Sequence, residues 1–378
     1  MPEDALVVPE IGGGLGPIPL VLDAVVVPPA KGLGNQSVQR SGVLRPDGGL
    51  VPESVTWRGT SRVTIQPRMP EEAEELGGTW LFLGPLFGHF GHFLVESISR
   101  IWAWGVLEGL VDGVLFVPKF QNRPRETLET YRPFLEALGV RARMVNVEEP
   151  TVVERLFVPP QGFGMFQMIE GSPEFRDFVR ARAGKGVAPD GPPRIYVSRS
   201  QLPVQRGSIL GEAVLEERLR AEGYEPFHPQ KHSFEAQIAA YRAARDVIAV
   251  DCSPLHLLAL VGDAGQRVGV IARRDGDLDQ VFARQIRAFQ GAEAHAVNHL
   301  QRNWIEEAAN RPSRTSWGEV DFSALGRSLR RAGLVEHGDW APLPEAEVLA
   351  QMERVGAAQG VRFKPYEGPK GTAPGDGD

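Results

Sequence analysis

The chain has 378 residues, of which 42% are hydrophobic and 24% are charged, and its formal net charge is −7 at pH 7. This composition is that of a globular protein of about two domains, and it excludes global disorder. The acidic balance argues against a nucleic-acid binder that works by bulk electrostatics. The single cysteine, Cys252, excludes an internal disulfide framework and a cysteine-rich zinc module.

No segment of the sequence predicts a membrane span or a secretory signal. Charged residues interrupt the longest apolar stretch, residues 243–260, which is shorter than the ~20 apolar residues that a span needs. The N-terminus begins Met1-Pro2-Glu3-Asp4, which is acidic, and it lacks the basic and apolar segments of a signal peptide. We therefore expect a cytoplasmic protein, and a peripheral position at a membrane remains compatible with the sequence.

The first half of the chain alternates short apolar runs with amphipathic segments. The first 60 residues, rich in proline and glycine, predict short strands joined by loops. Further along, strand and helix patterns alternate, which predicts an α/β domain over residues 1–185. The predicted strands are residues 20–27, 80–83, 114–118, 140–147 and 155–158, and the predicted helices are residues 91–110, 126–138 and 174–183.

A stretch of glycine and proline at residues 183–193 predicts a linker between two domains. Strand and helix patterns then alternate regularly, which predicts a parallel, doubly wound sheet in a second domain over residues 194–300. Residues 301–363 predict a helical segment, and residues 364–378 predict a disordered tail. In the second domain we expect strands at residues 194–198, 224–227, 246–250 and 267–272, with helices at residues 210–222, 233–244 and 254–261.

A tight turn from Asp251 to Pro254 joins a predicted strand to a predicted helix. Ser253 predicts the N-cap of this helix, and Pro254 suits its first position. The N–H groups at such a helix start face the carboxyl edge of the sheet, where phosphates bind in open α/β folds. His256, in the first turn, is a further candidate ligand for an anion. A plain turn with a structural histidine is the alternative interpretation.

Ser198 and Arg199 end another predicted strand, and Arg206 lies nearby in the sequence. An arginine at this position can bind a phosphate through two parallel hydrogen bonds. Since both loops follow parallel strands, we expect them at the same edge of the sheet. A surface arginine paired with a carboxylate is the alternative interpretation.

His92 and Glu96 stand four residues apart in a predicted helix, so their side chains can hydrogen bond on one helix face. A carboxylate that orients an imidazole gives a general base suited to neutral pH. Arg100, one turn further, is placed to neutralise Glu96 or a substrate anion. His89 and His92 have a metal-ligand spacing, but without a third ligand nearby in the sequence we expect no zinc site. A polar helix face at a domain surface is the alternative interpretation.

Several runs in a fixed order resemble a known family. The resemblance is to the catalytic domain of glycosyltransferase family 61, in its bacterial form, and it covers about residues 80–272. The runs that resemble the catalytic domain are IYVSR at 195–199, residues 210–223, SFEAQI at 233–238 and SPLH at 253–256, and those similar to its N-terminal signature are GHFLVE at 91–96 and RIW at 100–102.

The resemblance implies an inverting, metal-independent glycosyltransferase of GT-B architecture, with two Rossmann-like domains that face each other across a cleft. It implies a nucleotide-sugar donor, usually a UDP-sugar, in the C-terminal domain. It also implies a glycan or lipid-linked glycan acceptor in the N-terminal domain, no cofactor, and a setting in polysaccharide biosynthesis.

Within such a reaction the candidate residues take defined roles. His92, backed by Glu96, would take the proton of the acceptor hydroxyl, with His89 and Arg100 in acceptor or supporting positions. Without a metal, cations and helix starts must stabilise the leaving diphosphate. The candidates on the donor side are Ser198, Arg199, Arg206, Ser253 and His256, together with Glu235 and Gln237 for the sugar or ribose, although helix-start acidity explains Glu235 equally well.

Asp251 and Cys252 depart from the family's usual residues, and Gly211 precedes Glu212 where an asparagine is common. We expect the acidic side chain of Asp251 to repel a diphosphate. Two alternatives therefore stay open beside the glycosyltransferase. The first is a nucleotide-sugar epimerase or hydrolase on the same fold, and the second is a non-catalytic module that binds nucleotide or glycan.

Overall fold

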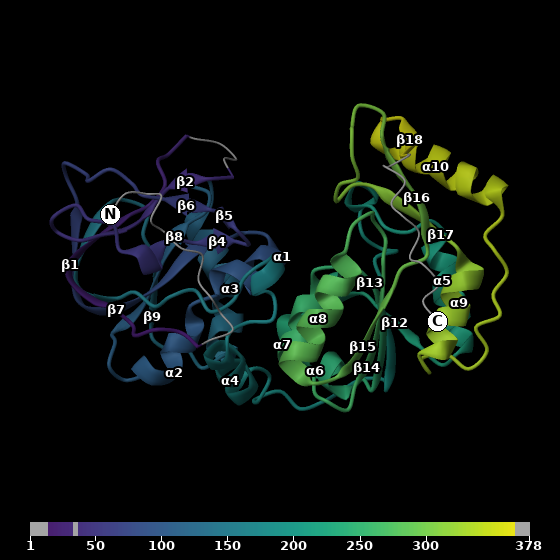
Figure 1. Ribbon diagram of the computed structural model, residues 1–378, viewed down its shortest axis with the longest axis horizontal. Helices are drawn as coiled ribbons and strands as arrows, with labels where there is room; N and C mark the ends of the chain where they lie inside the picture. Colours follow the sequence, from purple (N-terminus) through teal and green to yellow (C-terminus); the bar gives the residue numbers. More distant parts are fainter. Residues whose placement is uncertain (1–13, 33–36, 367–378) are drawn as a thin grey trace. The chain divides into compact units, whose positions relative to one another are not determined.

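The computed structural model describes residues 14–32 and 37–366, and the chain divides between Val187 and Ala188 into two compact units (Figure 1). We call them unit 1 and unit 2. The division lies within residues 183–193, the segment that the sequence predicts as a linker. Within the described ranges, no helix combines the length and the apolar character that crossing a membrane requires.

Unit 1 contains a six-stranded mixed sheet in the order β3-β1-β10-β7-β8-β9. Strands β10, β7, β8 and β9 run parallel, whereas β1 pairs antiparallel with both β10 and β3. Unit 1 is therefore α/β, but its sheet is not purely parallel. The strands of this sheet are β1 (Leu20–Val27), β3 (Gly42–Leu44), β7 (Glu74–Leu86), β8 (Gly113–Pro118), β9 (Arg143–Asn146) and β10 (Thr151–Phe157).

A buried core, two helices and several short elements complete unit 1. Buried aliphatic and aromatic side chains of β1, β7, β8 and β10 form its core. The helices predicted at 126–138 and 174–183 are confirmed as α3 (Pro124–Ala137) and α4 (Pro173–Arg182). The remaining elements are the strand pairs β2 (Gln39–Arg40) with β6 (Thr64–Ile65) and β4 (Trp57–Arg58) with β5 (Ser61–Arg62), and the 3₁₀ turns η2 (Pro52–Ser54) and η5 (Phe166–Met168).

The single helix predicted at residues 91–110 is wrong. The segment is broken into α1 (Phe90–His92), the π-turn η3 (Phe93–Ser97), the 3₁₀ turn η4 (Ile101–Ala103) and α2 (Trp104–Leu107). Every residue of η3 is buried, so packing on all sides, rather than one amphipathic face, determines its conformation. Such π-turns occur frequently at functional sites.

Unit 2 contains a five-stranded, fully parallel sheet in the order β12-β11-β13-β14-β15. Counted along the chain, this order is 2-1-3-4-5, which is one of the doubly wound orders. The strands and helices predicted in this region are confirmed, whereas the fifth strand of the sheet, β15, was not predicted. The strands are β11 (Arg194–Val197), β12 (Glu225–Phe227), β13 (Asp246–Val250), β14 (Arg267–Ile271) and β15 (Glu293–Val297).

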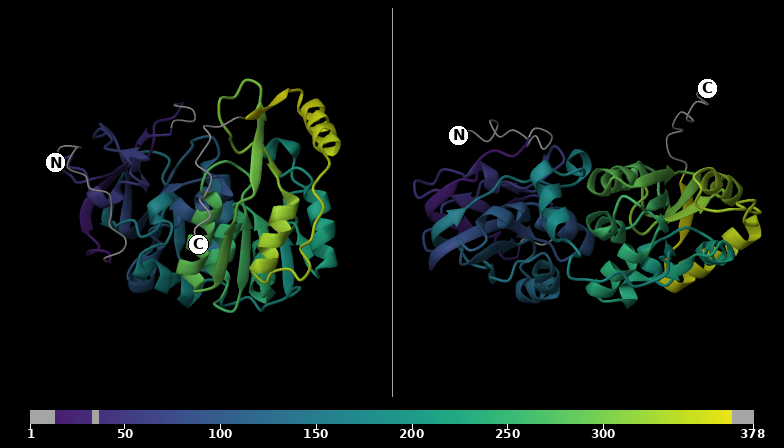
Figure 2. Two further views of the ribbon diagram at one scale, coloured as in Figure 1. Left: turned by 45° about the vertical axis from the view of Figure 1, so that its right-hand side comes forward. Right: turned by 90° about the horizontal axis from the view of Figure 1, so that it is seen from below.

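Helices cover both faces of this sheet (Figures 1 and 2). On one face lie α6 (Phe234–Ala243), α7 (Pro254–Val261) and α8 (Leu278–Gln290). On the other lie α5 (Glu212–Ala221) and α9 (Phe322–Arg331), whose apolar side chains form the main core with the sheet. Two 3₁₀ turns, η6 (Val204–Arg206) and η7 (Pro229–Lys231), lie in the loops after β11 and β12.

The C-terminal segment is not purely helical, which corrects the prediction for residues 301–363. Besides α9 and α10 (Glu345–Gln359), it forms a three-stranded antiparallel sheet of β16 (Leu300–Glu306), β17 (Trp317–Val320) and β18 (Phe363–Tyr366). The tail predicted to be disordered begins inside β18. Residues 367–378 lie outside the described part of the chain.

Candidate functional site

Charged side chains gather at the carboxyl edge of the parallel sheet in unit 2. Arg199 follows β11, Asp251 follows β13, and Arg273 and Arg274 follow β14. In the 2-1-3-4-5 order the topological switch point lies between β11 and β13, and ligands bind outside the strand ends at such a point. The sequence predicts that the loops after β11 and β13 lie at the same edge of the sheet, and the structure places both loops there.

Asp251 is paired with the two arginines of the next strand. Its side chain is buried, and its Oδ2 accepts a hydrogen bond of 2.9 Å from the backbone N–H of Arg273. Its Oδ1 lies 3.2 Å from Nε of Arg273 and 3.8 Å from Nη2 of Arg274. The carboxylate that we expected to repel a diphosphate is therefore compensated by two guanidinium groups. We call Arg199, Asp251, Arg273 and Arg274 the arginine cluster.

The arginine cluster carries more positive than negative charge. Burial, partly offset by Asp251, lowers the pKa of Arg273 to about 10, and the charges of Arg199 and Arg274 contribute to the lowering. Burial also lowers the pKa of Arg274, again with a contribution from Arg199. Among the described residues, Nη1 of Arg273 and Nε of Arg274 are buried without a hydrogen-bond partner. Two guanidinium groups thus share the carboxylate of Asp251, and the positive charge of Arg199 acts on both of them, so an anionic ligand would balance the excess positive charge.

Backbone carbonyls hold the side chain of Arg199. Its Nη2 donates to the carbonyls of Arg206 at 2.7 Å and Gly207 at 3.0 Å, and its Nε donates to Gly207 at 3.2 Å. The side chain of Arg206 is exposed, and it is the carbonyl of this residue that contacts Arg199. A phosphate contact for either arginine stays a prediction.

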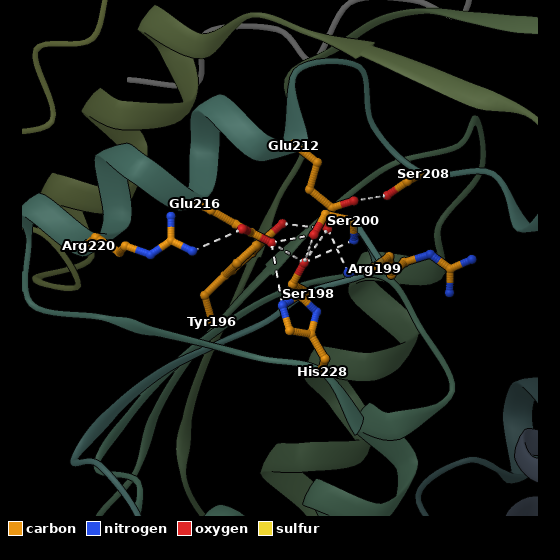
Figure 3. A network of polar contacts seen from close by, with 9 residues as sticks. All are labelled: Tyr196, Ser198, Arg199, Ser200, Ser208, Glu212, Glu216, Arg220 and His228. Carbon is orange, nitrogen blue, oxygen red and sulfur yellow. Dashed lines mark hydrogen bonds and ion pairs between the residues drawn. The ribbon is translucent and has the colours of Figure 1, made fainter. Parts of the chain in front are cut away.

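A buried network of hydroxyls and carboxylates lies beneath the loop that carries Arg199 (Figure 3). Glu212 accepts hydrogen bonds from the backbone N–H of Arg199 at 2.8 Å and the Tyr196 hydroxyl at 3.0 Å. Figure 3 shows the Arg199 side chain pointing away from these carboxylates. The network also includes hydrogen bonds of the Ser208 hydroxyl to Glu212 and of the Ser198 and Ser200 hydroxyls to Glu216.

This network supports the loop that carries Arg199. The sequence gives little indication that the network exists. Burial raises the pKa of Glu212, although hydrogen bonds from Ser208 and the Arg199 backbone oppose that effect. Ser198, predicted to contact the donor, is itself buried and bonded to Glu216 at 2.6 Å. Its hydroxyl fixes the loop, so a donor contact from it stays a prediction. Helical spacing places Glu212 and Glu216 on one face of α5, the one signal that could have paired them.

The start of α7 differs from the prediction. Ser253 already has helical backbone angles, and its side chain caps no N–H group, so the predicted side-chain cap is wrong. His256 is buried against α8, where its Nδ1 lies 2.7 Å from Oε1 of Gln285 and its ring packs on Phe282. The structure therefore places His256 in a protein contact, and an anion contact for it stays a prediction.

Two further donor-side candidates lie on α6. Glu235 is exposed near the start of the helix, where its negative charge interacts favourably with the helix dipole. Gln237 is buried, and its Nε2 donates to the carbonyls of Pro229 at 3.0 Å and His232 at 3.1 Å. The amide of Gln237 therefore holds the loop after β12, and a sugar contact for either residue is untested.

In unit 1 the predicted contact between His92 and Glu96 is confirmed. Nδ1 of His92 lies 2.6 Å from Oε2 of Glu96. The Glu96 side chain is fully buried, whereas 36% of the His92 side chain is exposed. Burial acts to raise the pKa of Glu96, but hydrogen bonds from His92 and Arg58 outweigh it and lower the pKa. An ionised carboxylate therefore orients a solvent-accessible imidazole.

Arg58, which the sequence did not single out, completes this group. Its Nε and Nη2 donate to the two oxygens of Glu96, both at 2.9 Å. Its Nη2 also lies 3.5 Å from Nδ1 of His92. Arg58 stands 38 residues before Glu96 in a short hairpin, so no local spacing could have paired them. We call Arg58, His92 and Glu96 the His92 triad.

The supporting role predicted for Arg100 toward Glu96 or a substrate is wrong. Arg100 is completely buried, and its guanidinium donates to the carbonyls of Glu53, Val55 and Pro159 and to the Thr56 hydroxyl. Burial lowers the pKa of Arg100 to about 9. Through these hydrogen bonds, Arg100 connects segments of unit 1 that are distant in sequence.

His89 contacts His92 edge to face, with ring centroids 5.3 Å apart. Within residues 14–32 and 37–366, no group of three or more histidine, cysteine or acidic side chains is arranged to hold a metal ion. The spacing of the two histidines thus has no third protein ligand in the described part of the chain.

Comparison with known protein families gives a match. Residues 90–264 match the family model Glycosyltransferase 61. The matched range includes His92, Glu96 and Arg199, and it crosses the division between the two units. No curated protein matches the chain. The chain therefore carries a domain of glycosyltransferase family 61, and the protein is a glycosyltransferase.

Proposed function

We propose that the protein is an inverting, metal-independent glycosyltransferase that moves a sugar from a nucleotide-sugar donor, in the first instance a UDP-sugar, to a glycan or lipid-linked glycan. The observation that carries the proposal is the arginine cluster at the switch point of the parallel sheet. Its unbalanced guanidinium groups suit a diphosphate, which is the leaving group of such a donor.

In the proposed reaction, the oxygen of an acceptor hydroxyl forms a bond to the anomeric carbon of the donor sugar. The bond from that carbon to the diphosphate oxygen breaks, and its electron pair leaves with the diphosphate. Attack from the opposite face inverts the anomeric centre. The hydroxyl proton goes to Nε2 of His92, since Glu96 holds the Nδ1 side of the ring.

On the donor side, Arg199 and Arg274 are the partly exposed members of the cluster and would contact the diphosphate. Arg273 lies behind them and would contribute its charge. A GT-B arrangement, with unit 2 binding the donor and unit 1 the acceptor, belongs to the same proposal. So does a cytoplasmic setting in polysaccharide biosynthesis, with peripheral membrane association when the acceptor is lipid-linked.

The test is isothermal titration calorimetry of the purified protein with UDP, GDP, CMP, ADP and NAD, each with and without EDTA. We expect one nucleoside phosphate to bind, unaffected by EDTA, and to stabilise the fold by about 2.7 kcal/mol at 100 times its dissociation constant. Arg199→Gln and Arg274→Gln should each weaken binding roughly 10- to 100-fold.

Arg354→Gln, which removes an exposed positive charge on α10, is the matched control and should bind normally. Absence of binding to every nucleotide would refute the donor site. Binding abolished by EDTA would refute metal independence. Conversion of a nucleotide sugar to an isomer or to free sugar, with no transfer to any acceptor, would favour the epimerase or hydrolase.

A further inference from the structure

We propose that Arg58 is a positioning residue for the His92 base, one that fixes the orientation of Glu96 and balances its charge. The inference rests on the proposed function of His92. Arg58 lies upstream of the residues that match the family model, so the match assigns it no role.

The first argument is geometric. Arg58 binds Glu96 through two parallel hydrogen bonds of 2.9 Å, and such a bidentate pair fixes the plane of a carboxylate. Oε2 of Glu96 is shared between Arg58 and His92. The position of the imidazole therefore depends on a carboxylate whose own position depends on Arg58.

The second argument concerns the proton. Because Glu96 is ionised, it accepts the hydrogen bond from Nδ1–H of His92, which leaves the lone pair of His92 on Nε2. The ring of Phe87 stacks on the imidazole of His92 with ring centroids 5.4 Å apart, and this contact also restricts the orientation of the imidazole. The lone pair is thus presented in one direction.

The third argument concerns charge. The charged and titratable groups that surround His92 are Glu96 on its own segment, Arg58 on β4, Lys119 after β8, and His89. The Cζ of Arg58 and the Nζ of Lys119 each lie 5.8 Å from the ring centroid of Phe87. Nη2 of Arg58 lies 3.5 Å from Nδ1 of His92 and 2.9 Å from Oε2 of Glu96, so it places a positive charge beside both the imidazole and the carboxylate.

The test compares the pH dependence of kcat/KM for the wild type, Arg58→Gln, Arg58→Lys and the control Arg40→Gln, an exposed arginine of unit 1. In Arg58→Gln the acidic limb should move to higher pH by roughly one unit, since removal of a nearby cation favours protonation of the base. The loss should be roughly tenfold on the acidic side and small on the alkaline side. Arg58→Lys should restore the limb, and Arg40→Gln should leave it unchanged.

A uniform loss at every pH, with the limb in its original place, would overturn the proposal, because a merely structural role predicts that result. A readout that needs no activity is the NMR titration of the His92 ring. Its midpoint should rise in Arg58→Gln, and an unchanged midpoint would overturn the coupling. If His92→Gln kept full activity, the proposed base would be wrong, whereas the NMR titration would still decide the effect of Arg58.

Discussion

Charge pairing over long sequence distances determines the environment of the key residues. We expected Asp251 to repel the donor, but the guanidinium groups of Arg273 and Arg274 compensate its negative charge. The position of these two arginines directly after a buried strand could have been noticed, because the same edge rule predicted Arg199. Arg58 and the buried role of Arg100 could not be predicted, since their partners lie 38 or more residues away.

Cys252 provides a prediction at the same scale. Burial raises the pKa of its thiol to about 12, so at pH 8 the reactive thiolate is almost absent. We expect iodoacetamide to leave the folded protein unlabelled at pH 8 and to label it fully in denaturant, as measured by intact mass. The single cysteine makes the readout unambiguous. Rapid labelling of the native protein would contradict the buried environment.

At the scale of elements, the sequence pattern predicted the strands and helices of residues 194–272 well and the segment after β7 poorly. The strands of unit 2 are short apolar runs bounded by turn residues, and their helices are amphipathic, so each pattern has one interpretation. Residues 91–110 show a helical stripe, but η3 is buried on every side, and a periodic stripe carries no information about packing of the other faces.

The loop that holds Arg199 gives a prediction for an element. Gly207 has a φ of +58°, and a Cβ added there would lie 2.3 Å from the carbonyl oxygen of Ser316. Gly207→Ala should therefore displace the carbonyl that binds Arg199, weaken nucleotide binding, and lower the free energy of unfolding by about 1–3 kcal/mol. Urea unfolding and calorimetry would measure both effects.

Gly186→Ala is the matched control, because nothing lies within 4 Å of an added Cβ at that position. It should leave stability and nucleotide affinity close to wild type. Equal behaviour of the two variants would show that the Gly207 turn does not hold Arg199.

At the scale of the whole molecule, the division into two units falls inside the glycine- and proline-rich segment at residues 183–193. The doubly wound sheet of unit 2 was predictable because βα alternation has few topological solutions. The antiparallel strands of unit 1 and the small sheet of β16, β17 and β18 were not, since pairing between strands far apart in the sequence leaves no local pattern.

The division gives a prediction for limited proteolysis. Lys185 is exposed at the end of unit 1, close to the division between the two units, and exposed loops at domain boundaries are preferred cleavage sites. We expect brief trypsin treatment to cut first after Lys185 and to give two fragments of similar size, identified by mass spectrometry. Lys185→Gln should delay this cut. First cleavage outside residues 183–193 would argue against two separately compact bodies.

The π-turn η3 constrains the length of the segment that carries Glu96. A π-turn amounts to one residue inserted into an α-helix. Loss of one residue there would rotate the residues after the deletion by about 100° relative to those before it. Because every residue of η3 is buried, side chains of this segment would then lose their present partners. If the contacts of Glu96 with His92 and Arg58 are required, such a deletion abolishes the reaction, and the length of the segment is fixed by a partner in a different part of the chain.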